Sequence, residues 1–347
     1  MYSSKELCAA LLFATILGIQ IFDSHQVTKA TLNSQEWADY KTKYSKTYTS
    51  ASTPEAYALF YYNYNKKLIN SHNVLADRGQ STYRLAINQF TDMRLIHFKA
   101  LFPKTTQPTT SSATTPPAVQ AAGTSFDPIT DLGLTIEVED QGTVCNSGWA
   151  YATAKAVEIF AANENAVATP TPLSAQNLID CAGSGTGCTK QVSQTAFDYL
   201  VVYNQPLYTK VDYKNNNLLK VQGMCVQPTT TTGTPINLAS YARITDADDA
   251  TMLNYVFNGF PVVIEFDPTS FAFMHYSSGI FQQPHTYGGS HYMTVIGYGT
   301  DTTTNLDYWL VLNSFGTTWG ENGYIRILRD TSKPLAKSAL FPTALGA

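Results

Sequence analysis

The second half of the chain contains four segments rich in β-branched and aromatic residues and punctuated by glycine. They are GFPVVIEF (259–266), HYMTVIGYG (291–299), DYWLVLNSFG (307–316) and GYIRILR (323–329). Residues of these types fit the pleated, half-buried surface of a sheet, and glycine is typical of the turns between strands. The segments therefore predict that residues 236–342 form a β-rich region.

Helical patterns come before these strands. Residues 147–163 predict a buried helix, because their apolar residues recur at helical spacing. The residues that carry this spacing are Trp149, Ala152, Ala156, Ile159 and Phe160. A second helix is predicted over residues 173–183, with Ser174 as its N-cap and Gly183 at its end. Helices at 124–235 followed by strands indicate an α+β fold with two subdomains.

A tract of threonine, proline and serine divides the chain. Residues 103–123 read PKTTQPTTSSATTPPAVQAAG, which has no periodicity and is typical of an extended, exposed linker that proteases can reach. Before this linker, residues 35–75 predict helix and residues 83–93 predict a short strand that leads into a turn. Residues 1–124 carry a net charge of +5 and the remainder carries −9, so the two parts attract each other if they dock.

The N-terminus has the pattern of a secretory signal peptide. Lys5 is followed by an apolar run from Leu7 to Phe22, which predicts a signal over residues 1–30 with cleavage within residues 24–30. An uncleaved membrane anchor is the alternative, although the run is short for a bilayer span. No second run of spanning length follows, so we expect no membrane contact after cleavage. The expected destination is outside the cell or a lysosome or vacuole, both of which permit disulfides.

The cysteines form an even set once the signal is removed. Cys8 lies in the predicted signal, which leaves Cys145, Cys181, Cys188 and Cys225 with three possible pairings. An even set in an exported chain favours two disulfides over a reactive thiol. No histidine follows at the spacing of a zinc site, so we expect neither a metal nor a cofactor. The overall net charge of −4 gives no indication of a nucleic-acid partner.

Four sequence blocks in the second half read QG (141–142), CNSGW (145–149), SHYMTVIGYG (290–299) and NSFGTTWGENGYIRI (313–327). In this order they together resemble the papain family of cysteine peptidases, in particular its cathepsin-L-like branch. This resemblance implies a papain-like peptidase domain at residues 124–342, with a cleft between a helical half and a β-barrel-like half. We expect such a chain to be a monomer.

The front of the chain resembles the inhibitory pro-segment of the same family. The family's interrupted Asn/Ile/Asn helix is matched by Tyr62, Asn65, Ile69 and Asn73. A shorter motif is matched by Asn88, Phe90 and Asp92, with Ala86 where glycine is usual. The resemblance implies a cathepsin-type inhibitory propeptide at residues 31–102, and therefore a zymogen. The implied ligands of the cleft are this pro-segment and other peptide or protein segments.

The family's catalytic positions can be carried over one by one. In working members a cysteine at the start of the central helix attacks the peptide carbonyl, helped by a histidine. An asparagine orients that histidine, and a glutamine helps to hold the oxyanion. Gln141, His291 and Asn313 match the last three roles, and Trp149 matches the residue after the nucleophile. The nucleophile's place therefore falls on Gly148, which has no side chain to attack with.

The resemblance also implies a disulfide pairing, and the pairing bears on two alternative nucleophiles. It pairs Cys145 with Cys188 and Cys181 with Cys225. If Cys145 were the nucleophile instead, Cys188 would lose its partner. Ser147 is a further alternative, but its neighbouring position on a helix points about 100° away from that of Gly148.

Several other positions depart from the family pattern near the expected cleft. Lys190 and Gln191 stand where the family has two glycines, and Asn146 stands where it has one. Tyr292 replaces a small residue, and Phe315 replaces the tryptophan that shields the histidine–asparagine pair. These departures favour a pseudopeptidase that keeps the cleft without the thiol. The alternatives are an active endopeptidase with a shifted or substitute nucleophile, including a water held by the histidine, and a secreted structural or storage protein.

Overall fold

The computed structural model describes most of the chain in two units. The described residues are 34–48, 54–106, 108, 112–189, 191–213, 221–245, 249–282, 289–330, 335–336 and 338–346. The predicted signal peptide, Lys190 and part of the predicted linker lie outside them. The first unit comprises Met1–Leu68 and Thr91–Met93, and the second comprises Ile69–Phe90 and Arg94–Ala347.

The first unit is built on helices of the predicted pro-segment. Helix α2 spans Ser34–Lys43 and α3 spans Glu55–Asp77, with α3 continuing into the second unit. The prediction of helix throughout residues 35–75 is wrong between these two helices. There Ser45 adopts a φ of 50° and the next helix begins after a proline, neither of which continues an α-helix.

Two residues of the predicted pro-segment motifs hold the first unit together. The side-chain amide of Asn65 donates to the carbonyls of Thr91 and Met93, at 2.9 Å each. Asp92 accepts hydrogen bonds from the hydroxyls of Tyr40 and Tyr48, at 2.9 and 2.7 Å. These motif residues therefore satisfy buried polar groups of the unit.

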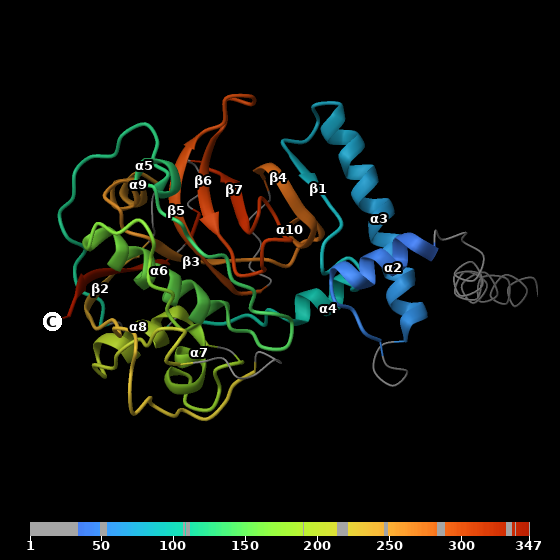
Figure 1. Ribbon diagram of the computed structural model, residues 1–347. Coiled ribbons are helices and arrows are strands. Elements are labelled where there is room, and N and C mark those ends of the chain that lie inside the picture. The colour runs from blue at the N-terminus through green and yellow to red at the C-terminus, as the bar shows by residue number, and fades with distance from the viewer. Residues whose placement is uncertain are drawn as a thin grey trace, which may run out of the picture. The chain divides into compact units, whose positions relative to one another are not determined.

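The second unit is organised around one eight-stranded sheet (Figure 1), in the order β1-β4-β7-β6-β5-β3-β8-β2. Its strands are β1 Tyr83–Leu85, β2 Leu238–Thr245, β3 Val262–Phe266, β4 Tyr276–Phe281, β5 His291–Thr300, β6 Asp307–Leu312, β7 Tyr324–Leu328 and β8 Ser338–Leu345. All neighbours are antiparallel except β4 and β7. The four segments predicted from β-branched and aromatic runs contain β3, β5, β6 and β7, and the strand predicted in the pro-segment is β1.

The helices of the second unit lie mostly before its long strands. They are α4 Leu95–Ala100, α5 Pro128–Asp131, α6 Gly148–Glu164, α7 Ala175–Asn177, the π-helical turn η1 Leu178–Ala182, α8 Ser193–Val201, α9 Asp249–Phe257 and α10 Phe271–His275. The helix predicted over 173–183 is formed by α7 and η1, and the hydroxyl of Ser174 caps it by accepting from the amide of Asn177. Helices α9 and α10 lie in the β-rich half and were not predicted.

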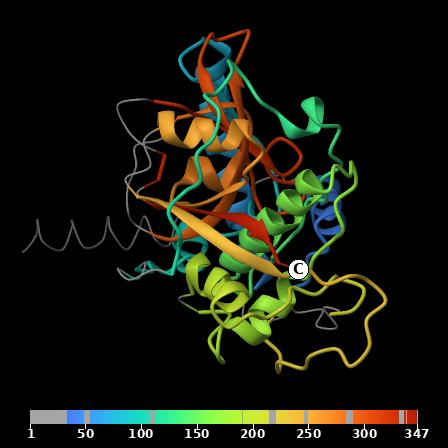
Figure 2. The same ribbon diagram turned by 90° about the vertical axis from the view of Figure 1, so that its left-hand side faces the viewer.

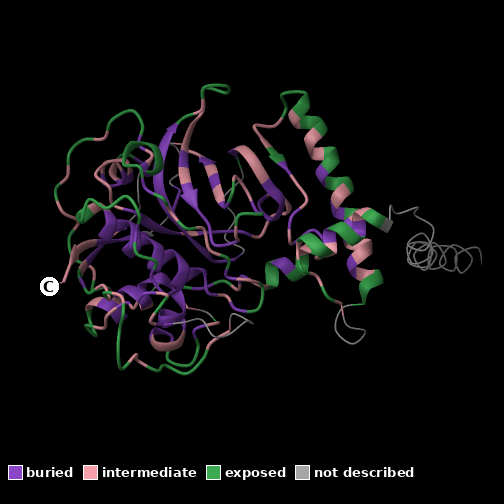
Figure 3. Cartoon of the chain, in the orientation of Figure 1, coloured by how far each residue is buried: buried purple, intermediate pink, exposed green. Residues whose placement is uncertain are grey.

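Helix α6 is the central helix of this unit. Its residues from Gly148 to Ala162 are all buried, which Figure 3 shows as continuous purple. A helix buried on every side needs small residues where its neighbours approach, and its many alanines provide them. Helix α6 packs against the sheet (Figure 2). The hydroxyl of Thr294 on β5 donates to the carbonyl of Ala152 at 3.0 Å and joins the two.

The predicted linker is less exposed than its composition suggests. The backbone amide of Thr114 donates to the carbonyl of Tyr241 at 2.9 Å, and that of Ala122 donates to the side chain of Asn254 at 2.8 Å. Thr105 is only 7% exposed. The prediction of an exposed spacer is therefore wrong at Thr105, whose backbone amide donates to the Ser290 hydroxyl, whereas Thr114 is exposed as predicted although its amide is bonded. Within the described residues, no helix combines the length and apolar character needed to cross a bilayer.

Candidate active site

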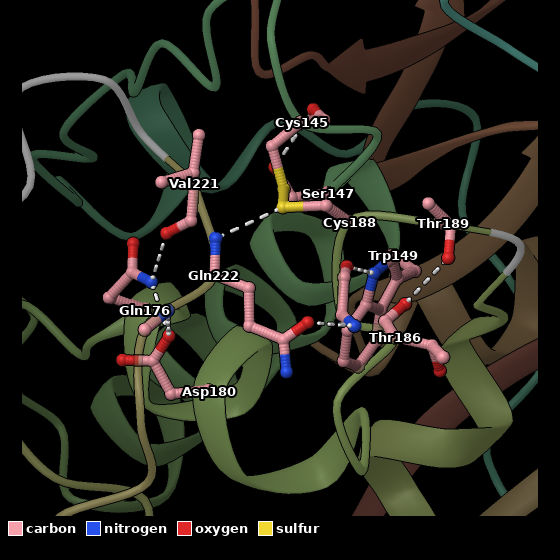
Figure 4. The surroundings of a disulfide bond; sticks show 12 residues. Cys145, Ser147, Trp149, Gln176, Asp180, Thr186, Cys188, Thr189, Val221 and Gln222 are labelled. Atoms are coloured by element: carbon pink, nitrogen blue, oxygen red, sulfur yellow. Dashed lines mark hydrogen bonds between the residues drawn. A yellow bond between two sulfur atoms is a disulfide. The ribbon is translucent and has the colours of Figure 1, made fainter.

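Gly148 is the first residue of α6, and a disulfide fixes the loop before it. The bond joins Cys145 to Cys188, whose α-carbons lie 4.5 Å apart (Figure 4). The amide of Asn146 donates to the carbonyl of Cys188 at 3.2 Å, and the indole of Trp149 donates to the carbonyl of Gly187 at 2.9 Å. The start of the helix is therefore tied to the segment around Cys188 on both sides of Gly148.

The second disulfide completes the pairing that the resemblance implies. Cys181 is joined to Cys225, and their α-carbons lie 4.7 Å apart. With Cys145 and Cys188 already paired, every cysteine of the described residues is part of a disulfide. The nucleophile of a cysteine peptidase is a thiolate, and a sulfur within a disulfide cannot form one.

His291 and Asn313 come together because their strands are neighbours. His291 begins β5, and Asn313 follows the end of the antiparallel strand β6. The His291 Nε2 lies 2.7 Å from the Asn313 Oδ1, which also accepts from the amide of Ser314 at 2.8 Å. Because this oxygen is an acceptor, Nε2 carries the proton of the neutral ring, and Nδ1 presents a lone pair.

Gln141 reaches the same place through a loop that pairs with the segment after Asn313. Its amide donates to the carbonyl of Ser314 at 2.9 Å, and its Oε1 accepts from the hydroxyl of Ser314 at 2.7 Å. Two residues away along each segment, the amide of Gly316 donates to the carbonyl of Glu139 at 2.9 Å. Gly316 has a φ of 71°, a conformation that a side chain would strain.

The four residues matched to the family's catalytic positions meet at Gly148. A Cβ built on Gly148 would lie 2.6 Å from the His291 Nδ1 and 3.2 Å from the Gln141 Oε1. Real Cβ atoms do not approach a ring nitrogen that closely, so the imidazole stands where a side chain on residue 148 would begin. Among the described residues, the His291 Nδ1 has no hydrogen-bond partner.

Aromatic rings cover the imidazole on the sides away from Gly148. The Phe315 ring stacks on it with centroids 4.7 Å apart and an interplanar angle of 24°, and the Phe102 ring meets it edge-on at 5.1 Å. His291 is fully buried, and this burial lowers its pKa to about 4, against the smaller opposing effect of the bond to Asn313. The ring is therefore neutral at neutral pH while Phe102 is in place.

The part of the predicted pro-segment that belongs to the second unit contacts this site directly. The side chain of Asn88 donates to the carbonyl of Met274 at 2.8 Å, and that of Gln89 donates to the carbonyl of Phe315 at 2.5 Å. The Phe90 ring lies edge-on to Phe315 at 5.2 Å. Sequence reasoning singled out Asn88 and Phe90 but missed Gln89, Phe102 and Ser314. The sequence signal for Gln89 and Ser314 is their position in the chain, directly after the matched residues Asn88 and Asn313.

A cavity of about 180 Å³ lies beside Gln141 and the first disulfide. It is lined by Ala100, Leu101, Pro103, Gln141, Gly142, Thr143, Val144, Cys145, Asn146, Cys188 and Thr189. One wall comes from the end of the predicted pro-segment, and the other walls come from the loop before α6 and the segment at Cys188. The space is large enough for a side chain of a bound peptide.

The other departures from the family pattern have definite structural roles. Tyr292 is buried, and its hydroxyl lies 3.1 Å from the Thr105 hydroxyl. Phe315 stacks on the imidazole as described, and the side-chain amide of Gln191 donates to the Thr186 hydroxyl at 2.5 Å. Within the residues that the structure describes, no cluster of three or more His, Cys, Asp and Glu could hold a metal ion.

Comparison with known proteins decides the family. The model of the papain family cysteine protease matches residues 122–343, and the model of the cathepsin propeptide inhibitor domain matches residues 37–95. The chain belongs to the papain family of cysteine proteases. The resemblance seen in the sequence is therefore confirmed at the level of the family and its propeptide.

Curated relatives match most of the chain. A probable cysteine protease of Arabidopsis thaliana, RDL6, is 32% identical over 300 residues, which are 85% of this chain and 80% of that protein. Cathepsin L of Sarcophaga peregrina is 29% identical over 333 residues, which are 91% of this chain and 95% of that protein. Papain-family relatives of plants and insects thus match both the propeptide and the peptidase region.

Solved structures of precursors share the fold. Digestive procathepsin L 3 of the Tenebrio molitor larval midgut superposes with a TM-score of 0.75 at 29% identity and covers 91% of this chain and 100% of its own. A recombinant stem bromelain precursor gives a TM-score of 0.75 at 27% identity and covers 89% and 98%. The fold is papain-like, with helices, a mixed sheet and a propeptide domain, as predicted.

Proposed function

We propose that this papain-family chain is a pseudopeptidase, which keeps a peptide-binding cleft and lacks the nucleophile. One observation carries the proposal. At the start of α6, the position that faces the His291 Nδ1 is Gly148, and the imidazole lies 2.6 Å from where its Cβ would be. An acyl–enzyme needs a nucleophilic side-chain atom at this place, and glycine has none.

The neighbouring residues offer no substitute nucleophile. Cys145 is part of a disulfide, so attack by its sulfur would first require reduction. Ser147 is fully buried, and its hydroxyl donates to the carbonyl of Cys145 at 3.3 Å. Loss of the nucleophile from a comparable serine triad lowers turnover by about 10⁶, so the remaining imidazole and amide sustain almost no cleavage.

The wider biology that we propose follows from the zymogen-like organisation. A signal peptide at residues 1–30, a propeptide at 31–102, a linker at 103–123 and a peptidase-like domain at 124–342 describe an exported proprotein. Its destination is extracellular or a lysosome or vacuole, which the two disulfides support. We propose that it acts as a monomer whose cleft holds its own pro-segment or another peptide.

One observation favours a second candidate function. The lone pair on the His291 Nδ1 has no partner among the described residues, so it could accept a proton from a water once Phe102 has left. Such a protein would be a slow hydrolase that uses a water directly. Its activity would depend on His291 and would not form a covalent intermediate.

Peptide hydrolysis separates these functions. The purified protein, with its linker cut and its pro-segment displaced, is incubated with a mixed peptide library, and products are identified by mass spectrometry. The pseudopeptidase predicts no products beyond those of the His291→Ala control. Products that disappear in that control would establish the water-based hydrolase and end the proposal. The Gly148→Cys variant tests separately whether the remaining groups still support cleavage.

A further inference from the structure

The segment that leaves the propeptide makes a second, polar contact just beyond the imidazole. Thr105 lies in a tract whose composition predicts exposure, and it is 7% exposed. Its backbone amide donates to the Ser290 hydroxyl at 2.9 Å. Its hydroxyl lies 3.1 Å from the Tyr292 hydroxyl and donates to the Glu265 Oε1 at 3.4 Å. The backbone amide and the hydroxyl of this buried threonine therefore both have hydrogen-bond partners.

The three partners of Thr105 belong to the framework that also holds the imidazole. Ser290 and Tyr292 flank His291 in the chain, and Glu265 pairs with Tyr292 across strands β3 and β5. Since the Thr105 hydroxyl donates to Glu265, the Tyr292 hydroxyl donates to Thr105. Serine and threonine are the residues whose hydroxyl, one bond beyond Cβ, can both accept from Tyr292 and donate to Glu265.

Phe102 is the apolar counterpart of Thr105, three residues earlier. Phe102 is 2% exposed, and its ring centroid lies 5.1 Å from that of His291 and 5.7 Å from that of Phe315. Its carbonyl oxygen lies 2.6 Å from where a Cβ on Gly289 would be, so this backbone approach requires glycine. Lys104, between the two anchors, is exposed, and Pro103 is half-buried. Recognition therefore rests on the first and fourth positions of the segment.

We propose that this surface is a peptide-recognition site selective for a Phe-x-x-Thr or Phe-x-x-Ser sequence, with the chain's own residues 102–105 as its resident ligand. We name it the Phe-x-x-Thr site and define it by Glu265, Ser290, Tyr292, His291 and Phe315. The proposal rests on the proposed function, because a working peptidase would cut such a peptide rather than hold it. The occupant in trans is a protein segment with the same two anchors, which competes with the chain's own segment.

Residues 102–105 occupy the site because they belong to the same chain as the receptor residues. A tethered segment has an effective concentration in the millimolar range, so a free peptide of ordinary affinity does not displace it. Weakening both anchors in the chain removes this competition. The full-length Phe102→Ala/Thr105→Ala variant therefore has a vacant site that keeps every receptor residue.

The test measures binding of a fluorescent peptide with the sequence of residues 101–106, LFPKTT, by fluorescence polarisation. We expect the double variant to bind it at least about 10-fold more tightly than the wild-type chain does. Replacing the Thr105 equivalent of the peptide by valine should weaken binding about 10-fold, because the Tyr292 and Glu265 groups lose their partner. The matched control replaces the equivalent of exposed Thr106 by valine, which should change affinity less than 2-fold.

A double-mutant cycle assigns the selectivity to the hydroxyl pair. Tyr292→Phe in the vacant receptor should weaken the threonine peptide several-fold and leave the valine peptide unchanged. Equal affinity of the threonine and valine peptides for the vacant receptor would overturn the proposal. If Tyr292→Phe weakened the binding of both peptides equally, the effect would be structural and not due to the hydroxyl. That result would also overturn the proposal.

A second measurement serves if the double variant does not fold. In the wild-type background, the single change Thr105→Val should raise amide hydrogen exchange across residues 102–105 about 10-fold, whereas Thr106→Val should not. Unchanged exchange in the Thr105→Val chain would overturn the proposal. Failure of the proposed function is seen separately, as cleavage of the peptide by mass spectrometry. If the peptide stays uncleaved but the threonine and valine peptides bind equally well, the proposed function stands and the Phe-x-x-Thr site is refuted.

Discussion

The helix side and the strand side of the candidate site differ in what they contribute. The helix side, at the start of α6, presents Gly148 with no side chain. The strand side, at β5 and after β6, presents an imidazole bonded to Asn313 at 2.7 Å and covered by Phe315 and Phe102. The strand-side groups are mutually bonded and buried, so removing one leaves others unsatisfied. Under the proposed function, chemistry can therefore be lost at one helix position while the binding surface persists.

Among single substitutions, the largest expected effect comes from removing the aromatic cover of the strand side. Phe315→Ala should lower the free energy of unfolding by about 3–5 kcal/mol, because it leaves a cavity between several buried rings. Urea denaturation of the full-length chain measures this effect. The matched control is Ile96→Ala, whose side chain is 57% exposed and whose loss should cost within about 0.5 kcal/mol. A cost below about 1 kcal/mol at Phe315 would show that the cover adds little stability.

Acid should weaken the strand side next. Burial lowers the pKa of both His291 and His275 to about 4, so each is protonated below pH 6.5 when unfolded but remains neutral when folded. The unfolded chain then binds more protons, and stability falls from pH 6.5 toward pH 4, by on the order of 3 kcal/mol for each histidine. Glu158, on the helix side, has a pKa raised by burial and opposes this trend at the acidic end.

Urea denaturation at half-unit intervals between pH 7 and pH 4 measures this dependence. The His275→Gln variant should show about half the slope, since one of the two buried histidines no longer titrates. A free energy of unfolding that is constant or rises as the pH falls through this range would contradict the burial of neutral imidazoles.

The smallest effect should appear on the helix side. Gly148→Ala should lower the free energy of unfolding by about 1–2 kcal/mol, because crowding against the imidazole outweighs the better helix propensity of alanine. The matched control is Gly223→Ala, whose Cβ would make ordinary contact at 3.4 Å with Asp180. In a His291→Ala background the cost at residue 148 should vanish. A neutral or stabilising Gly148→Ala change in the wild-type chain would show that the imidazole gives way freely.

The sequence predicted those elements whose pattern is long and regular. Helix α6 and strands β3, β5, β6 and β7 have enough apolar residues in period to identify them. Elements with a weaker pattern were not singled out, namely strands β2, β4 and β8 and helices α9 and α10, because their conformation depends on neighbours far along the chain. The docked linker was missed for the same reason, since Thr105 is held by residues about 160–190 positions away.

The candidate site was predictable as a set of positions but not as a geometry. The family motifs indicated Gln141, Gly148, His291 and Asn313, and the structure brings these four together. The residues alone left three disulfide pairings open, and only the resemblance selected one. The closeness of the imidazole to Gly148 depends on how Phe102 and Phe315 confine the ring, and no local pattern contains that information.

Thiol alkylation of the native protein tests the central claim most directly. The full-length chain is treated with iodoacetamide without reductant, and the peptides that contain Cys145, Cys181, Cys188 and Cys225 are mapped by mass spectrometry. The account predicts no adduct at any of the four, because each is in a disulfide and no thiol faces the imidazole. A stoichiometric adduct at Cys145 would reveal a reactive thiol beside the site and would contradict the account.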